Sequence, residues 1–439
     1  MGGSGLVAIA LLVLAYAAVS QRLSGSMITS AIVFVAGGVL ASEELLGWLD
    51  PTIGSEPVRW IAEATLVVVL FADASGIDVD AMRREYIVPL RLLAIGLPLT
   101  IVAGALAGVA VLGELSVIEA ILLAIVLAPT DAALGQAVVT DRRVPSRVRQ
   151  GLNVESGLND GICVPLLLIA IAVAEAEEGA IGNGAAVRLV LEEIGYGCIG
   201  GVVAGLAAAL VVRFCVPRGL VESSWLQVVP VAAALLAYGL AVWMGGSGFI
   251  AAFVGGAVFG VLRRELGGGV TFFLEEAGSF LGAATFVLFG AVMLVPVLDG
   301  LTADVVLYSV LSLTVVRMVP VALAMLGSAA RRPTVAFLGW FGPRGLASIV
   351  FAVILADEAD LVHESVLLDT VFLTIALSVL LHGLTASSLA TRYAAWFAAH
   401  PPDAEPSFEA VPAPEQRPPG WAVRLRGRRE DAEDSAART

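Results

Sequence analysis

The sequence predicts an all-α polytopic membrane protein. Of its 439 residues, 58% are hydrophobic and 15% are charged, whereas an ordinary soluble domain has roughly 25% charged residues. The mean hydropathy is +0.92, and the apolar residues form long runs, many of them near the roughly 20 residues that cross a bilayer as a helix. The runs lack the alternation of a membrane β-barrel, and 47 Gly residues suit close helix packing. These observations exclude a soluble protein.

Charge and cysteine content exclude several classes of function. The chain has 39 acidic and 25 basic residues, a formal net charge of −14, so nucleic acid is not an expected partner. Cys163, Cys198 and Cys215 lie in or beside apolar runs without metal-ligand spacing, and we interpret them as packing residues. No cofactor is expected. The first apolar run, residues 6–19, has no basic segment before it and Arg22 after it, so we expect a retained span and not a cleaved signal peptide.

The apolar runs predict about thirteen transmembrane helices. They are residues 6–21, 27–42, 58–77, 87–112, 116–139, 148–174, 188–212, 224–244, 247–262, 271–297, 303–327, 334–356 and 364–390. We assign residues 1–395 to a transmembrane domain. Residues 396–439 are rich in Pro, Ala, Glu and Arg without an apolar period, which predicts a disordered cytoplasmic tail.

The charges of the connecting loops predict the orientation in the membrane. Cytoplasmic loops carry an excess of Arg and Lys, and the predicted loops alternate between basic and acidic along the chain. The basic connections, which we place in the cytoplasm, contain Arg22, Arg83, Arg84, Arg142, Arg143, Arg147, Arg149, Arg213, Arg218, Arg263, Arg264, Arg331, Arg332 and Arg392. This alternation predicts an external N-terminus and a cytoplasmic C-terminus. We expect the protein to lie in the cell (plasma) membrane.

A weak internal symmetry predicts where a ligand binds. Spans one to six correspond to spans eight to thirteen, with the seventh as a connector, so the two six-helix repeats have inverted topology. Pro129 in the fifth span then corresponds to Pro343 in the twelfth. Paired helices interrupted by Pro or Gly mark the binding site of many transporters. We therefore expect broken fifth and twelfth helices that meet near the middle of the membrane.

The fifth span contains the polar segment Ala128-Pro129-Thr130-Asp131. Pro129 has no N–H to donate to the carbonyl of Ile125, so the helix is loosened and carbonyls become available to an alkali cation. Asp131 could stabilise the positive ends of the broken helices. The alternative is a simple kink in which Asp131 satisfies stray backbone donors.

The sixth span carries two polar ladders. Glu155 and Asn159 are four residues apart, as are Ser156 and Asp160, so each pair lies along one face of a helix. Carboxylate, amide and hydroxyl oxygens suit a hard cation such as Na⁺. The alternative is a hydrogen-bond network that only joins helices, a role that fits Glu155 and Asn159 better than Asp160.

Two basic residues in predicted spans require partners because an isolated buried charge is costly. Arg317, in the eleventh span, has Glu155 as its natural partner, which sets Asp160 apart as the candidate ion-binding carboxylate. Arg344, in the twelfth span, could offset the carbonyl ends at the second helix break. Asp73 could line a cavity, although its place near the end of the third span fits a solvated side chain equally well.

These motifs, in this order, resemble those of the NhaP-type sodium/proton antiporters. They are Thr130-Asp131, Glu155-Ser156-Gly157-Leu158-Asn159-Asp160, Val316-Arg317-Met318-Val319-Pro320 and Gly342-Pro343-Arg344-Gly345. The resemblance covers roughly residues 1–395. It implies thirteen helices, a homodimer with a mobile core part, and electroneutral exchange marked by the Asn159-Asp160 pair.

The resemblance also implies roles for single residues. Asp160 would be the shared site of the proton and the cation, with Thr130, Asp131 and Ser156 as further Na⁺ ligands. Glu155, Asn159, Arg317 and Arg344 would support that site. The chain departs from many relatives at Ala132, where they have Pro, which leaves open the Thr130 atom that binds the ion.

Competition at Asp160 would explain exchange, because one carboxylate cannot hold a proton and a cation together. We therefore expect a secondary active transporter, not an enzyme, that exchanges Na⁺, and also Li⁺, for H⁺ in an electroneutral 1:1 ratio. A K⁺/H⁺ antiporter of the same architecture is the nearest alternative. An ion-coupled carrier of an organic anion, with Arg344 as the substrate's partner, an intramembrane aspartyl protease and a passive channel are more distant alternatives.

Overall fold

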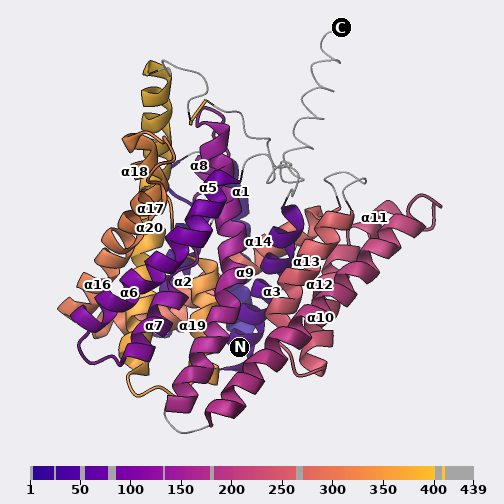
Figure 1. The fold of residues 1–439 in the computed structure, drawn as a ribbon, viewed down its shortest axis with the longest axis horizontal. Helices are drawn as coiled ribbons and strands as arrows, with labels where there is room; N and C mark the ends of the chain where they lie inside the picture. Colours follow the sequence, from indigo (N-terminus) through magenta and orange to yellow (C-terminus); the bar gives the residue numbers. More distant parts are fainter. Residues whose placement is uncertain are drawn as a thin grey trace. The chain divides into compact units, whose positions relative to one another are not determined.

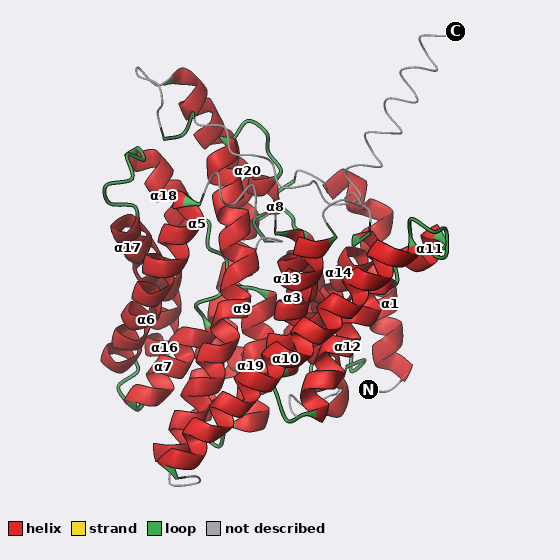
Figure 2. Ribbon diagram, turned by 45° about the vertical axis from the view of Figure 1, so that its right-hand side comes forward, coloured by secondary structure: helices red, strands yellow, loops and turns green. Residues whose placement is uncertain are grey.

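The computed structural model describes residues 3–23, 26–49, 55–77, 86–131, 134–177, 182–263, 270–400 and 408–410. Their regular structure is helical, apart from one isolated bridge between Ser42 and Leu49 (Figure 1, Figure 2). The chain divides into two compact units. Unit 1 comprises residues 1–66, 85–191 and 281–413, and unit 2 comprises residues 67–84, 192–280 and 414–439.

Most helices belong to unit 1, and three cross a unit boundary. Unit 1 contains α1 (Gly3–Leu23), α2 (Ser30–Ala41), α5 (Ile87–Arg91), η1 (Leu92–Gly96), α6 (Leu97–Val111), α7 (Val117–Val126), α8 (Gln136–Val139), α9 (Ser146–Glu177), η3 (Phe289–Leu294), α15 (Val295–Asp299), α16 (Ala303–Leu313), α17 (Val315–Ala324), α18 (Arg332–Trp340), α19 (Leu346–Glu358) and α20 (Glu364–Ala399). The boundaries fall within α3 (Glu56–Gly76), α10 (Asn183–Cys215) and α14 (Phe272–Leu288). Unit 2 contains α11 (Ser223–Leu226), α12 (Val229–Trp243) and α13 (Gly248–Leu262).

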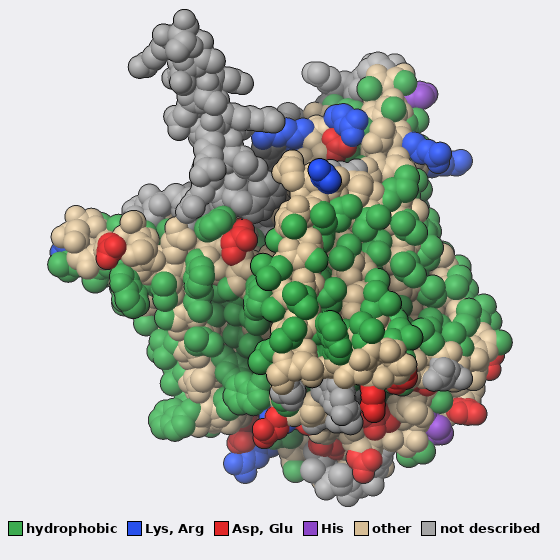
Figure 3. All heavy atoms as spheres, turned by 180° about the vertical axis from the view of Figure 1, so that it is seen from behind, with side chains coloured by type: hydrophobic (Ala, Val, Ile, Leu, Met, Phe, Trp, Pro, Cys, Tyr) green, Lys and Arg blue, Asp and Glu red, His purple; other side chains and the backbone are tan. Residues whose placement is uncertain are grey.

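The helices confirm a polytopic membrane protein. Within the described residues, eight helical stretches are long and apolar enough to cross a membrane, and three further apolar helices are shorter. The surface of unit 1 agrees with this assignment, because α6, α16 and α17 expose Leu106, Leu307 and Val315 by 67%, 50% and 53%. Figure 3 shows this surface on its right side as a broad field of hydrophobic side chains with charged side chains near its two ends. Such a surface is stable against lipid and not against water.

The interior of unit 1 is built around two short, largely buried helices. Every residue of α19 from Leu346 to Leu355 is buried, and all residues of α7 from Glu119 to Val126 are buried except Ile121, which is half-buried. A helix that is apolar on nearly all sides lies in a core. There α7 and α19 pack against each other, and each packs against α9 and α20 (Figure 1). Both short helices end or begin at the chain interruptions predicted from Pro129 and Pro343.

Proline also shapes two helices in a way that the sequence analysis did not predict. The π-helical segments η1 and η3 each end two residues before a proline, Pro98 in α6 and Pro296 in α15. Proline lacks an N–H and its ring clashes with the carbonyl four residues earlier. A π-helical widening is a known accommodation of an interrupted hydrogen-bond ladder. The predicted fourth and tenth spans are therefore wider at these points than continuous α-helices.

Unit 2 is held together by close helix contacts at glycine. A Cβ at Gly201 of α10 would lie 2.5 Å from the Ala251 carbonyl oxygen of α13, and one at Gly205 would lie 2.5 Å from that of Gly255. Such contacts place the two backbones against each other, which is the packing that small residues permit in membranes. The abundance of glycine therefore has a direct structural role in this unit.

The last described helix continues past the predicted start of the tail at residue 396. α20 has 36 residues and ends at Ala399. At about 1.5 Å per residue, its length exceeds the roughly 30 Å thickness of a bilayer's hydrocarbon core. Its final turns are stabilised by ring contacts, with Tyr393 stacked on Phe337 at 4.2 Å and on Trp396 at 5.6 Å. The remainder of the predicted tail lies outside the described residues, except residues 408–410.

Candidate functional site

The two interrupted helices meet at their breaks. α7 ends at Val126, and the chain then runs without helix to Asp131; we call residues 127–131 the first break. α18 ends at Trp340 and α19 begins at Leu346, and residues 341–345 between them are the second break. The Asp131 N–H donates to the Pro343 carbonyl oxygen at 2.8 Å, which joins the two non-helical segments directly. Backbone outside a helix is tolerated at membrane depth only where protein or a cavity surrounds it, so these segments mark a candidate site.

Asp131 lies at the N-terminus of the second broken helix. Its Oδ2 accepts a hydrogen bond from the Leu346 N–H at 3.0 Å, where the partial positive charge of α19 favours a carboxylate. The approach is so close that a Cβ on Gly345 would overlap the Asp131 carboxylate. Glycine is thus required at position 345. The Asp131 carboxylate, which belongs to the first break, compensates the partial positive charge at the N-terminus of α19, which follows the second break.

Arg344 compensates the opposite charge at the first break. Its side chain is fully buried, and Nη1 donates to the carbonyl oxygens of Ala128 at 2.7 Å and Pro129 at 3.1 Å. These carbonyls follow the C-terminal end of α7, where partial negative charge accumulates. Arg344 was expected from the sequence to offset the carbonyls of the second break, and this expectation is wrong: its side chain reaches the carbonyls of the first break, because the two segments cross.

The α9 helix presents its polar face to the first break. The Ser156 hydroxyl donates to the Thr130 carbonyl oxygen, and Asn159 Nδ2 donates to Thr130 Oγ1 at 2.7 Å. Asp160 lies one turn beyond Ser156 on the same face, and its side chain is 7% exposed. Thr130 is thus held by two residues of α9, one turn from the buried carboxylate.

Glu155 and Arg317 form a buried ion pair beside these contacts. The Arg317 guanidinium on α17 donates to both Glu155 oxygens, at 2.6 and 2.9 Å, and both side chains are 3% exposed. A bidentate pair fixes geometry as well as charge. The Arg317 side chain passes so close to the second break that a Cβ on Gly342 would overlap it. The pairing predicted from the sequence is present.

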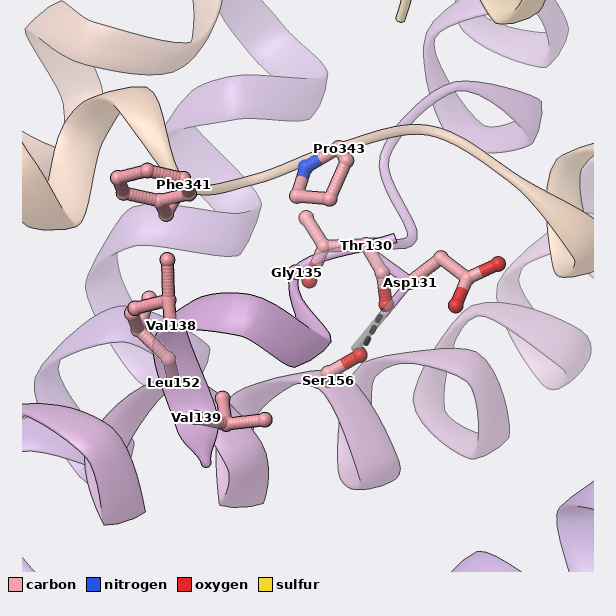
Figure 4. A pocket seen from close by; sticks show the side chains of 9 residues that line it. All are labelled: Thr130, Asp131, Gly135, Val138, Val139, Leu152, Ser156, Phe341 and Pro343. Atoms are coloured by element: carbon pink, nitrogen blue, oxygen red, sulfur yellow. Dashed lines mark hydrogen bonds between the residues drawn. The ribbon is translucent and has the colours of Figure 1, made fainter. Parts of the chain in front are cut away.

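A pocket of about 260 Å³, including its open mouth, lies where the first and second breaks cross, a place that we call the crossing. Figure 4 shows Thr130, Asp131 and Ser156 on one side, with the Asp131 carboxyl extending away from the apolar side. The apolar side is formed by Val138, Val139, Leu152 and Phe341, and Gly135 and Pro343 complete the lining. Oxygen atoms therefore gather against one wall of a pocket that is otherwise apolar.

The structure separates some predicted residues and adds others. Asp73 on α3 is exposed, belongs to unit 2 and does not line the pocket. Ser378 and His382 on α20 contact the second break at Arg344 and Trp340 and were not predicted from the sequence. A signal was present, because His382 is the only histidine within the predicted spans and lies four residues after Ser378.

Crossed and interrupted helices with compensated ends define the architecture of a secondary transporter. The chain belongs to the family of transmembrane sodium/hydrogen exchangers, whose model matches residues 7–392.

Individual relatives are similar to the chain at lower coverage. The chain is 28% identical over 208 residues to a probable Na⁺/H⁺ antiporter of Schizosaccharomyces pombe, covering 45% of this chain and 27% of that one. It is 26% identical over 381 residues to the K⁺/H⁺ antiporter NhaP of Alkalimonas amylolytica, covering 85% and 63%. It is 25% identical over 354 residues to the Na⁺/H⁺ antiporter ApNhaP of Aphanothece halophytica, covering 77% and 66%. The chain thus spans less than two thirds of the length of each.

Solved structures support the fold. The structure at pH 8 of a sodium proton antiporter from Methanocaldococcus jannaschii matches with a TM-score of 0.73 at 18% identity, covering 88% of this chain and 98% of that one. An electron-microscopy structure of the sodium proton antiporter from this organism matches with a TM-score of 0.66 at 18% identity, covering 90% and 98%. The arrangement of helices is therefore that of a known class of antiporter structure.

Proposed function

We propose that this protein is a secondary active antiporter that exchanges a monovalent cation for H⁺ across the cell membrane. One observation carries the proposal: Asp160 is buried on α9, one turn from a serine whose hydroxyl binds the carbonyl of the first helix break. Membership of the sodium/hydrogen exchanger family supports it. An ionisable residue buried in a membrane protein is costly and is retained for transport or catalysis.

The transported cation binds at the oxygens around the crossing. Asp160 supplies the charge, and Thr130, Asp131 and Ser156 supply further oxygen ligands. A hydroxyl that donates a hydrogen bond keeps its lone pairs for a cation, so the contact from Ser156 to Thr130 is compatible with this role. Oxygen ligands suit Na⁺ and Li⁺, which are hard cations. Na⁺ is cargo at this site and not a resident cofactor.

Exchange follows from competition for Asp160. The carboxylate holds a proton or a cation, and either ligand removes its net charge. A bare carboxylate that crosses a hydrophobic barrier is penalised by several kcal/mol, so the protein changes its access only when Asp160 is occupied. The Glu155–Arg317 pair and the Arg344 contacts keep the surrounding charges compensated during both halves of the cycle.

Electroneutral 1:1 exchange is the expected ratio. The residue before Asp160 is Asn159, whose amide donates to the Thr130 hydroxyl at 2.7 Å and carries no charge. One cation therefore replaces one proton at one carboxylate, and no net charge crosses the membrane per cycle. The proposal also includes a homodimer, an external N-terminus and a cytoplasmic C-terminus, supported by the alternating loop charges and the resemblance to NhaP-type proteins.

A K⁺/H⁺ antiporter is the second candidate. The relative from Alkalimonas amylolytica is named a K⁺/H⁺ antiporter, and it aligns with more of this chain than the two Na⁺/H⁺ antiporters compared above. Both candidates use the same site and differ in the cation that fits it. A direct comparison of cations therefore decides between them.

The test uses the purified protein in proteoliposomes that contain a pH dye. External pulses of Na⁺ and Li⁺ are expected to make the lumen more alkaline, with smaller responses to K⁺. Asp160→Asn is expected to abolish the response. Asp304→Asn makes the same chemical change at an exposed position in the first turn of α16 and is expected to transport like the wild type.

Other results would redirect or remove the proposal. A larger response to K⁺ than to Na⁺ would establish the second candidate. Exchange that persists in Asp160→Asn, or a wild-type protein that responds to none of the cations, would contradict antiport at Asp160. A current on solid-supported membranes would contradict electroneutral exchange.

A further inference from the structure

α20 carries a row of polar side chains at intervals of four residues, buried along one face. Thr370, Thr374, Ser378 and His382 are exposed by 0%, 0%, 0% and 1%. Residues four apart lie one above another on a helix. Thr374 Oγ1 donates to Ser309 Oγ on α16 at 3.0 Å, so the upper part of the row joins two helices. The lower part, Ser378 and His382, contacts the second helix break instead.

His382 holds the end of α18. Its Nε2 lies 2.9 Å from the carbonyl oxygen of Trp340, the last residue of α18, and its ring lies 5.2 Å from the Trp340 ring. The same carbonyl accepts the Gly342 N–H at 2.9 Å. The final carbonyls of a helix have no partner within it. With its hydrogen on Nε2, the His382 ring donates to the Trp340 carbonyl from outside α18.

Ser378 holds the segment four residues further along. The Arg344 N–H donates to Ser378 Oγ at 2.6 Å, and Ser378 Oγ lies 3.2 Å from His382 Nδ1. His382 Nδ1 also lies 3.0 Å from the Ser378 carbonyl oxygen, so the neutral ring can donate to Trp340 from Nε2 or to Ser378 from Nδ1. We assign the hydrogen to Nε2, which gives the bond to Trp340 and leaves Nδ1 to accept from the Ser378 hydroxyl. α20 therefore fixes the backbone on both sides of the Phe341–Pro343 segment.

The fixed backbone carries the groups that face the ion site. From its position at Ser378, Arg344 extends Nη1 to the carbonyl oxygens of Ala128 and Pro129. The neighbouring Pro343 carbonyl accepts the Asp131 N–H at 2.8 Å. A shift of the second break would thus move the chain segment that contains Thr130. Binding sites require their groups within roughly 0.5 Å of the productive geometry.

We infer that Ser378 and His382 are positioning residues for cation binding, which act by holding the second helix break in register with the first. The inference rests on the proposed antiport function and assigns α20 a part in it. Neither side chain touches the cation. Their loss weakens cation affinity because the oxygen ligands around Thr130 are displaced, while proton occupancy of Asp160 and the conformational cycle continue.

The first test compares transport kinetics of four variants in proteoliposomes. Removal of the buried donor in His382→Leu, or of the acceptor in Ser378→Ala, is expected to raise the apparent KM for Na⁺ about tenfold. The maximal rate per inserted protein is expected to change less than about twofold. His382→Gln keeps an N–H donor near the Nε2 position and is expected to restore most of the affinity. Thr374→Val, on the same helix face away from the break, is the matched control and is expected to keep the wild-type KM.

A purely structural role predicts a different pattern. It would lower the amount of folded protein and the maximal rate in all four variants, with the KM unchanged. That result, or a KM that rises equally in Thr374→Val, would overturn the inference.

A second test does not depend on transport. The chain has three histidines, so ¹⁵N-histidine labelling gives a simple NMR spectrum in which His363→Gln and His400→Gln assign two of them. The His382 ring is expected to carry hydrogen on Nε2. A ring with hydrogen on Nδ1 alone could not donate to Trp340 and would overturn the inference. If the wild-type protein transports no cation, the proposed function fails, and the spectrum still tests separately whether His382 donates to the Trp340 carbonyl.

Discussion

At the scale of single residues, the crossing has no room for a side chain where glycine approaches a charged group. Gly345 lies against the Asp131 carboxylate and Gly342 against the Arg317 guanidinium, so that an added Cβ would overlap either group. Both glycines were visible in the sequence as part of one motif. The steric requirement for glycine at these positions was not visible, because it depends on side chains from other parts of the chain. The residue types could be predicted, and their contacts required the structure.

Gly345→Ala is expected to abolish cation/proton exchange. Its methyl group would displace the Asp131 carboxylate from the Leu346 N–H and open the crossing. Gly239→Ala is the matched control, because a Cβ at Gly239 of α12 meets nothing within 4 Å. The measurement is the pH response of proteoliposomes at equal protein content. Normal exchange in Gly345→Ala would show that the contact is not needed.

Asn159→Asp is expected to lower the melting temperature by several degrees without making transport electrogenic. The substitution removes the donor to Thr130 Oγ1 and adds a buried charge one turn from Glu155, and each loss of a buried hydrogen bond costs about 1–3 kcal/mol. Thermal unfolding in detergent and current recordings on solid-supported membranes measure the two effects. A stable variant that produces a current would contradict this account of Asn159.

At the scale of elements, a short segment of the C-terminal region anchors the start of α18. Glu409 accepts hydrogen bonds from the Arg331 N–H at 3.0 Å and the Thr334 hydroxyl at 2.7 Å. Phe408 is 5% exposed, and its ring lies 4.8 Å from the Arg147 guanidinium. A carboxylate at the N-terminus of a helix is favourable. The sequence predicted a tail here from its composition, which carries no information about a two-residue anchor.

The anchor is expected to stabilise the protein at neutral pH and to be lost in acid. Burial raises the pKa of Glu409, but the hydrogen bonds from Arg331 and Thr334 outweigh it and hold the pKa below its ordinary value. A lowered pKa in the folded state means that the stabilisation is complete above the ordinary pKa and disappears as pH falls through the lowered one. Glu409→Gln should therefore lower the melting temperature at pH 7.

The control for this prediction is an exposed carboxylate. Glu222, before α11, is exposed and makes no capping hydrogen bond with its side chain, so Glu222→Gln is expected to melt like the wild type. The difference between the wild type and Glu409→Gln should shrink below the ordinary glutamate pKa of 4.5. A difference that is absent at pH 7, or independent of pH, would contradict the anchor.

At the scale of the whole molecule, composition and proline positions predicted the polytopic helical class and the two breaks. Apolar runs report directly on burial in lipid, and Pro129 and Pro343 report on lost hydrogen bonds. The partner of each break could not be predicted, since Arg344 reaches the carbonyls of the other broken helix. The contribution of α20 was missed for the same reason. The number of thirteen helices and the inverted repeats remain predictions.

In the proposed mechanism, a proton and a cation compete for Asp160. This competition can be measured by counting the protons that the purified protein releases when it binds Na⁺ in weakly buffered solution near pH 7. We expect about one proton per bound Na⁺, a Na⁺ affinity that weakens as pH falls, and no release from Asp160→Asn. Na⁺ binding without proton release, or an undiminished release from Asp160→Asn, would contradict it.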